Sequence, residues 1–264
     1  MNFLNKLPGP VLVFLGACAL SFGGLIVKSF EGANLWQILF WRSVFFSIVV
    51  LFFLLTTYKK NFFNSIYKIG LPGFFGGIVL SCGYAGYVFA MYNTTVANAN
   101  FIIQTQTIFL AFGGIFLMLG SSLTSGQMIG NIAAFIMPIS FAVLILTVRK
   151  YPNVDMIPLQ LIAGIGAIII GYIFSSKIIL SSHDLFLGFI AGFFQVGLGF
   201  IFITIGAKTT PSALVGIIML TEAILGPLWA WLFINETPPI VVLVGGTIVL
   251  LAVVLQFFNR KIVK

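Results

Sequence analysis

Charged side chains are scarce in this sequence. They make up 7% of the residues, against 60% that are hydrophobic, and only 5 of them are acidic. Soluble globular domains carry about 25% charged residues, so a soluble fold is excluded. The mean hydropathy of +1.17 predicts a chain whose solvent is the lipid bilayer.

Cysteine and histidine are almost as rare. Cys18 and Cys82 lie inside apolar runs, and His183 is the only histidine. Two isolated thiols exclude a disulfide framework and metal-ligand spacing. The sequence also has no phosphate-binding loop, dinucleotide fingerprint or catalytic triad. We therefore predict no enzymatic activity, no cofactor and no metal, and ATP-driven transport is disfavoured.

The net charge is +8, which would suit a nucleic-acid partner. The basic residues, however, stand in short segments between apolar runs. Membrane proteins concentrate lysine and arginine in this way in their cytoplasmic loops. The predicted partners are therefore the lipid bilayer and a small-molecule substrate, and not nucleic acid.

Apolar runs long enough to cross a bilayer follow one another along nearly the whole chain. They are continuous rather than alternating, which favours helices over a membrane β-barrel. The predicted fold is an all-α integral membrane protein. Its nine apolar runs cover residues 9–28, 34–56, 70–91, 99–120, 127–149, 156–176, 185–206, 211–234 and 239–258.

The two halves of the chain resemble each other. The letters GFFGG at 73–77 match GFIAG at 188–192, at an offset of 115 residues. At the same offset, NTT at 93–95 matches KTT at 208–210. This agreement in register over about twenty residues indicates an internal repeat.

Farther along, the offset between the two halves changes. The letters FGGIFLML at 112–119 match VGGTIVLL at 244–251, at an offset of 132 residues. The first half therefore lacks about 17 residues, which correspond to Leu225–Val241 in the second half. We predict a single membrane domain built from a shortened first repeat, 1–125, and a second repeat, 126–264. The run 99–120 would join the start of a fourth helix to the end of a fifth.

Basic residues predict the topology, because they favour the cytoplasmic side. An ancestral order of ten spans with a cytoplasmic N-terminus leaves only Lys28 and Lys177 outside. The ten that then face the cytoplasm are Lys6, Lys59, Lys60, Lys68, Arg149, Lys150, Lys208, Arg260, Lys261 and Lys264. Nine strict spans would place five inside and seven outside. Residues 93–98 and 121–126 are therefore expected on the same side, with 99–120 dipping into the membrane and returning.

Several motifs resemble the drug/metabolite transporter superfamily, in its EamA-like permease branch. They are FWRSVFF, NTT before the fourth helix, and ALVGIIMLTEAILGPLWAWLFINETPPIVVLVGGTIVLLAVV with Pro227, Glu236 and Gly245–Gly246. The resemblance covers nearly the whole chain. It implies ten helices in two five-helix repeats that transport small metabolites such as amino acids. Because each repeat has an odd number of helices, the second repeat crosses the membrane in the opposite direction to the first. Such inverted repeats are a hallmark of secondary transporters.

Two charged residues lie deep inside predicted spans. Glu222 is roughly 16 Å and Arg42 roughly 12 Å from the start of its helix, at 1.5 Å per residue. A charge at this depth is costly and by default indicates function. Glu222 suits proton coupling or a cationic group, and Arg42 suits a carboxylate. The alternatives are a structural pair between them, or Arg42 extending toward the interface.

Further polar residues are candidates for a substrate cavity. Asn100, Gln104 and Thr107 have the spacing of one helical face. Their alternative role is hydrogen bonding between helices. Gln195 and Tyr84 fall on helices that the resemblance places around a central cavity. All five are predicted to contact substrate or to couple transport.

The predicted function is a secondary transporter that moves a small polar metabolite, such as an amino acid or a related compound, by alternating access. It would lie in the plasma membrane, the bacterial inner membrane, as a multi-pass protein with both termini in the cytoplasm. The main alternative is a membrane protein that lost transport with the internal deletion and persists as an interaction subunit. A homodimer that restores a cavity wall is a third possibility.

Cysteine labelling tests the topology. In a background without Cys18 and Cys82, a cysteine replacing Ser122 should react with a membrane-impermeant reagent from the periplasmic side. The charge distribution predicts this result because a dipped segment returns to its own side. Labelling from the cytoplasm alone would establish nine true spans and overturn the charge argument.

Overall fold

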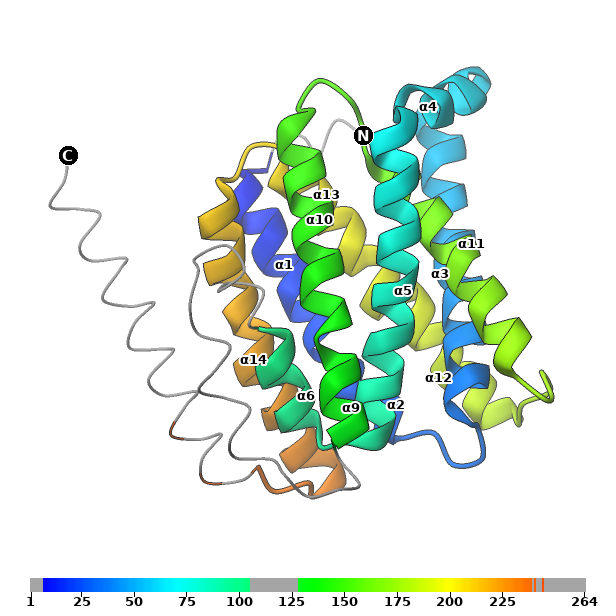
Figure 1. Ribbon diagram of the computed structural model, residues 1–264, viewed down its shortest axis with the longest axis vertical. Coiled ribbons are helices and arrows are strands. Elements are labelled where there is room, and N and C mark those ends of the chain that lie inside the picture. The colour runs from blue at the N-terminus through cyan, green and yellow to red at the C-terminus, as the bar shows by residue number, and fades with distance from the viewer. Residues whose placement is uncertain (1–6, 105–127, 239, 241–243, 245–264) are drawn as a thin grey trace, which may run out of the picture.

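The computed structural model describes residues 7–104, 128–238, 240 and 244, and every element in these ranges is a helix (Figure 1). The helices of the first part are α1 (Gly9–Ser21), α2 (Gly23–Lys28), α3 (Leu35–Tyr58), η2 (Lys59–Asn61), α4 (Phe62–Lys68), α5 (Gly70–Asn93) and α6 (Val96–Ile103). Those of the second part are α9 (Met128–Ala134), α10 (Ile136–Lys150), α11 (Ile157–Phe174), α12 (Ser182–Ile190), η3 (Ala191–Leu198), α13 (Gly199–Ala207) and α14 (Ser212–Ile234).

Six helical stretches in the described ranges are long and apolar enough to cross a membrane. They are Gly9–Lys28, Leu35–Lys68, Gly70–Asn93, Ile157–Phe174, Ser182–Ala207 and Leu214–Ile234. Each overlaps a predicted apolar run, and Leu35–Lys68 continues beyond the run 34–56 through η2 and α4. The run 127–149 forms α9 and α10, which meet at Phe135. Most of 99–120 and nearly all of 239–258 fall outside the described residues, so the ten-span count stays a prediction.

Polar side chains mark where the helices begin. The Asn34 side chain accepts hydrogen bonds from the backbone N–H groups of Trp36 and Gln37, both at 3.0 Å. The Gln37 side chain accepts from the Asn34 backbone N–H at 2.9 Å in return. This capping box satisfies donors that the first turn of α3 leaves open. Ser181 and Thr95 cap α12 and α6 with their hydroxyl groups.

The two ends of the bundle differ in charge. Among the described residues, one end holds six cationic side chains and one acid, and we call it the basic end (upper in Figure 1). Its charged residues are Lys59, Lys60, Lys68, Arg149, Lys150, Lys208 and Asp155. The opposite, acidic end holds Lys28, Lys177, Glu31, Asp184 and Glu236. An excess of cations at one end is what the positive-inside rule produces on a cytoplasmic face.

Asp155 ties three segments together at the basic end. Its carboxylate accepts hydrogen bonds from the Lys208 ammonium at 2.9 Å, from the Ile157 backbone N–H at 3.2 Å, and from the Tyr58 hydroxyl. The Arg149 guanidinium donates to the Lys208 carbonyl oxygen at 3.2 Å. Because Tyr58 ends α3, Arg149 lies in the last turn of α10 and Lys208 follows α13, these bonds join both halves of the chain.

Two acids tie the opposite end. Asp184 accepts hydrogen bonds from the backbone N–H groups of Glu31 and Gly32, at 3.1 and 3.0 Å, which fixes the α2–α3 loop to the start of α12. Glu236 accepts from the Val96 backbone N–H at 2.6 Å and so joins the segment after α14 to the start of α6. Both carboxylates satisfy backbone N–H donors of another segment, and such donors are costly to leave unpaired when buried.

Helix α9 begins at the end of the bundle where α5 finishes. A methyl group placed on Gly130 would lie 3.1 Å from the Cβ atom of Asn93, so the two helices touch there. The expectation that residues 93–98 and 121–126 lie on the same side of the membrane stays a prediction. Residues 121–126 themselves lie outside the described residues.

The span from α12 to α13 is interrupted by a π-helix. Element η3, Ala191–Leu198, has π geometry between two α-helical segments. At the offset of 115 residues, the matching part of the first half falls inside the regular helix α5. Short π segments inside α-helices often occur at functional sites, and η3 contains the candidate residue Gln195.

Close approach of η3 to α3 depends on one glycine. A methyl group on Gly192 would collide with the carbonyl oxygen of Arg42 and lie 2.6 Å from the Cβ atom of Phe45. Four residues earlier, a methyl group on Gly188 would lie 3.4 Å from the Cβ atom of Trp41, an ordinary contact. Small residues allow membrane helices to pack this closely.

These glycines form a matched pair for a stability test. Gly192→Ala should destabilise the purified protein by about 1–3 kcal/mol, the usual cost of overpacking. Gly188→Ala should change the stability little. Thermal unfolding in detergent, followed by intrinsic fluorescence, measures both. Equal midpoints for the two variants would contradict the packing described here.

Candidate functional site

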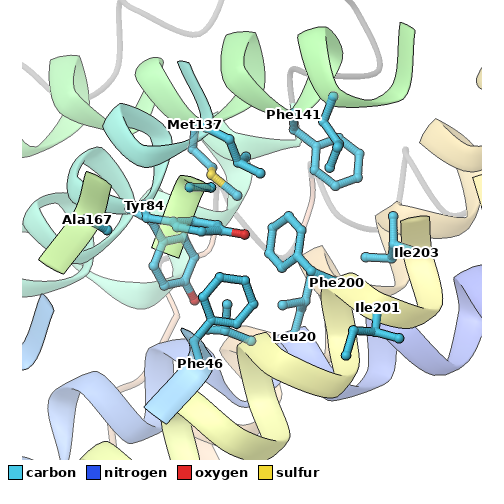
Figure 2. Close-up of a cluster of buried hydrophobic side chains, with 14 of the residues drawn as sticks. Leu20, Phe46, Tyr84, Met137, Phe141, Ala167, Phe200, Ile201 and Ile203 are labelled. Atoms are coloured by element: carbon cyan, nitrogen blue, oxygen red, sulfur yellow. The ribbon is translucent and has the colours of Figure 1, made fainter. Parts of the chain in front are cut away.

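The two halves of the chain meet around a small cavity in the middle of the bundle. Its walls come from α1, α3, α5, α6, α10, η3, α13 and α14, and Figure 2 shows five of the side chains: Leu20, Tyr84, Met137, Phe141 and Phe200. The others are Arg42, Tyr87, Ile103, Gln195, Val196, Met219 and Glu222. Four residues predicted from the sequence, Arg42, Tyr84, Gln195 and Glu222, therefore line one cavity.

Arg42 lies on α3 and is only 2% exposed. Its guanidinium group lies over the ring of Tyr87, 5.3 Å from the centroid, and over that of Tyr84, at 5.8 Å. One guanidinium nitrogen donates a long hydrogen bond of 3.5 Å to the Tyr84 carbonyl oxygen. The faces of aromatic rings attract a desolvated cation, so the two tyrosines compensate part of the cost of burying this charge.

Glu222 reaches the cavity from α14 and is 4% exposed. Its carboxyl group interacts with the side chain of Gln104, which directly follows α6. One helical turn away, Asn100 packs against Gly226 of α14. Asn100 and Gln104 thus share a face, as their spacing predicts, and this face meets α14. Both are buried, although neither lines the cavity itself.

No ion pair joins Arg42 to Glu222 in the part of the chain that the structure describes. The structural pair considered from the sequence is therefore absent. Tyr87 also lines the cavity, and the Arg42 guanidinium group lies over its ring. A guanidinium group and a carboxyl group thus line one cavity without an ion pair between them.

Several buried polar atoms at this site have no hydrogen-bond partner among the described residues. They are the Tyr87 hydroxyl oxygen, the Gln195 side-chain oxygen, and both the oxygen and the nitrogen of the Asn100 side-chain amide. Gln195 uses only its nitrogen, which donates to the Leu20 carbonyl oxygen at 3.4 Å. Leaving such groups unpaired costs about 1–3 kcal/mol each. A polar ligand or water in the cavity that pairs with the Tyr87 and Gln195 oxygens would recover part of this cost.

Tyr84 is held by a hydrogen-bonded chain that crosses three helices. Its hydroxyl group donates to the Gln160 side-chain oxygen on α11 at 2.8 Å. The Gln160 amide nitrogen donates to the Thr204 hydroxyl on α13 at 2.9 Å. The ring also forms edge-to-face contacts with Phe46 and Phe200, with centroids 5.5 and 5.1 Å apart (Figure 2). The ring that supports Arg42 is thus fixed on several sides.

Sequence reasoning missed three of these residues. Tyr87, Gln160 and Thr204 were not among the predicted site residues. Each is a polar residue within an apolar run, which is the same signal that identified Glu222. Among the predicted residues, Thr107 lies outside the described part of the chain, so its place at the site stays a prediction.

The cavity is small in this conformation. About 10 Å³ of it admits the centre of a water molecule, which is room for roughly one water. Its chemistry combines one cation, one acid, hydroxyl groups and an amide with apolar walls. Among the described residues, no group of three or more His, Cys, Asp or Glu side chains gathers to hold a metal ion.

A double-mutant cycle tests the Tyr84–Gln160 bond. Tyr84→Phe should destabilise the protein by about 1–2 kcal/mol, because it leaves the buried Gln160 oxygen without its donor. With Gln160→Leu as the second change, the coupling should reach at least about 0.5 kcal/mol. Tyr172→Phe, on the exposed side of α11, is the matched control. Its effect on the free energy of unfolding should simply add to that of Gln160→Leu. Additive effects of Tyr84→Phe and Gln160→Leu in thermal unfolding would show that the bond does not form.

Comparison with known proteins adds independent evidence. The sequence model described as "EamA-like transporter family" matches residues 7–139 and again residues 132–258. Four chains of solved structures match. One of them, described as "Crystal structure of protein", is 15% identical over 91% of this chain and 96% of that chain, with a TM-score of 0.70. At this identity the likeness shows the fold alone. No curated protein matches the chain.

Proposed function

Because the chain belongs to the EamA-like transporter family, we propose that it is a secondary transporter that moves a small polar metabolite across the membrane by alternating access. The observation that supports this most directly is the cavity lined by both Arg42 and Glu222. Ionisable residues inside the membrane are costly and mark substrate or ion pathways. Substrate sites of secondary transporters lie near the midplane, between the repeats, and residues of both halves of the chain line this cavity.

The lining favours a substrate with two opposite charges. The Arg42 guanidinium group can bind a carboxylate through two parallel hydrogen bonds. Glu222 can bind an ammonium group. The side-chain oxygens of Tyr87 and Gln195, which have no partner among the described residues, can accept hydrogen bonds from further donors. An amino acid or a related compound has this chemistry. The apolar walls, among them Phe200 and Met219, would receive its side chain.

Transport requires the cavity to open, because it now holds roughly one water. In the proposed cycle, the contacts at one end of the bundle break while those at the other end persist. At the basic end the contacts to break are those of Asp155 with Lys208 and Tyr58. At the acidic end the contacts to break include the hydrogen bond from the Trp229 indole N–H to the Ser21 hydroxyl. This bond is 3.0 Å long and joins α14 to α1.

The location and topology are part of the proposal. The excess of cationic residues at the basic end supports placing that end in the cytoplasm, with the protein in the plasma membrane, as in the bacterial inner membrane. The change of offset between the halves is the basis for proposing a first repeat shortened by about 17 residues within an ancestral ten-span order. The contact between Asn93 and Gly130 supports placing the end of α5 and the start of α9 on the same side of the membrane. A homodimer that completes the cavity wall is compatible with this arrangement.

Ligand-induced stabilisation tests the proposal. The purified protein should be screened by thermal shift against amino acids, sugars, polyamines and organic acids. A ligand at 100 times its dissociation constant stabilises by about 2.7 kcal/mol. Glu222→Gln keeps the shape of the side chain but removes its charge, so the shift of a cationic or zwitterionic ligand should disappear. Glu31→Gln, at an exposed acid of the acidic end, is the matched control.

The outcomes distinguish a wrong assignment of the site from an absence of transport activity. A ligand shift that persists in Glu222→Gln would contradict the assignment of the site. A well-folded protein that no compound stabilises, and that moves none of them into proteoliposomes, would favour the alternative of a membrane protein without transport activity.

A further inference from the structure

The segment between α3 and α5 turns sideways at both of its ends. Lys59, which follows α3 and starts η2, has a φ of 46°, and Gly70, which starts α5, has a φ of 59°. Positive φ is uncommon for a residue other than glycine, and a structure retains it where the surroundings demand the turn. The two turns direct η2 and α4 away from the helix axes, across the basic end of the bundle (Figure 1).

This segment is amphipathic. Phe62 and Ile66 pack against the hydrophobic core, whereas Phe63 is 81% exposed and Tyr67 is 86% exposed. Each pair has i, i+4 spacing and so shares a side of the helix. Lys60, Asn64 and Lys68 follow the same spacing on a neighbouring side, and all three are exposed. The exposed surface of the segment thus combines two aromatic rings with lysines.

The lysines of the segment are not neutralised by the acid of the basic end. Asp155 is already bound to Lys208, with their charged atoms 2.9 Å apart, and to the Tyr58 hydroxyl. Within the described residues, neither ion pair found involves Lys59, Lys60 or Lys68. Three positive charges within ten residues therefore create an unbalanced field next to exposed aromatic rings.

From this combination we propose that η2 and α4 form a binding site for the headgroups of anionic phospholipids. Aromatic side chains prefer the boundary between headgroups and acyl chains, which suits Phe63 and Tyr67. Long lysine side chains reach from that depth to the phosphate layer. Lysines close to an anionic membrane surface each contribute on the order of a fivefold gain in affinity. Together Lys59, Lys60 and Lys68 would give roughly a hundredfold preference over zwitterionic lipid.

This site is distinct from the cavity between the repeats. It lies at the basic end and uses none of the residues that line the cavity. It therefore does not depend on the proposed transport activity, and it would hold for the full chain even if the protein transported nothing.

The experiment compares two lipids that differ in headgroup charge. The full-length protein in neutral detergent is titrated with phosphatidylglycerol or with phosphatidylcholine of the same acyl chains. Retained lipids are counted by native mass spectrometry, and thermal unfolding is recorded in parallel. The wild type should retain phosphatidylglycerol and be stabilised by it, and half-saturation with phosphatidylcholine should need roughly a hundredfold more lipid.

Two triple variants make the comparison specific. Replacement of Lys59, Lys60 and Lys68 by glutamine should abolish the preference for phosphatidylglycerol. Replacement of the same three residues by arginine should preserve it, because the charge remains. As a control, replacement of Lys28 and Lys177 by glutamine removes positive charge at the acidic end only and should leave the preference intact.

Three results would overturn the proposal. They are equal retention of the two lipids by the wild type, an undiminished preference in the glutamine variant of the segment, and an equal loss in the control variant. An equal, saturable stabilisation by inorganic phosphate would assign the site to a free anion rather than to a lipid. If the triple glutamine variant does not fold, Lys60→Gln and Lys68→Gln are measured singly, and each should lose part of the preference.

Discussion

The centre of this protein depends on one constraint, the burial of the Arg42 guanidinium group, which has no carboxylate partner in the described part of the chain. A permanent cation inside an apolar bundle is stable only if its surroundings supply substitutes for water. Here the faces of two tyrosine rings and one carbonyl oxygen of α5 provide them. The ring of Tyr84 must therefore stay in place, and Gln160 and Thr204 hold it from α11 and α13. The core around Arg42 is organised by this charge as much as by apolar packing.

The same constraint explains why the surrounding helices lie so close together. Cation–π contacts require α3 and α5 to face each other at short range, and η3 packs on the backbone of Arg42 from another side. Only a residue without a side chain fits there, which is the position of Gly192. Apolar side chains gain little by leaving lipid for the protein interior. Close packing and buried polar contacts must therefore stabilise the bundle.

Much of the fold and part of the site could be predicted from sequence because the bilayer imposes strong rules. A run of about 20 apolar residues must be a helix, so the spans that became α3, α5 and α11 were evident. A charge inside such a run is conspicuous, which identified Arg42 and Glu222. The chain from Tyr84 through Gln160 to Thr204 was not predictable in the same way. Its members are 76 and 44 residues apart, and only the packing of three helices brings them together. The lack of an ion pair between Arg42 and Glu222 among the described residues likewise follows from their geometry and not from their residue types.

The small volume of the cavity has a thermodynamic consequence. A conformation with room for one water cannot hold a metabolite, so any ligand must bind to an open conformation of lower population. The apparent affinity then equals the intrinsic affinity multiplied by the populated fraction of that conformation. If the open conformation were populated at about one part in a hundred, binding would be weakened by about a hundredfold. Substitutions that loosen the contacts of Asp155 would therefore lower the stability of the closed protein while raising its apparent affinity, so the two properties are expected to change in opposite directions.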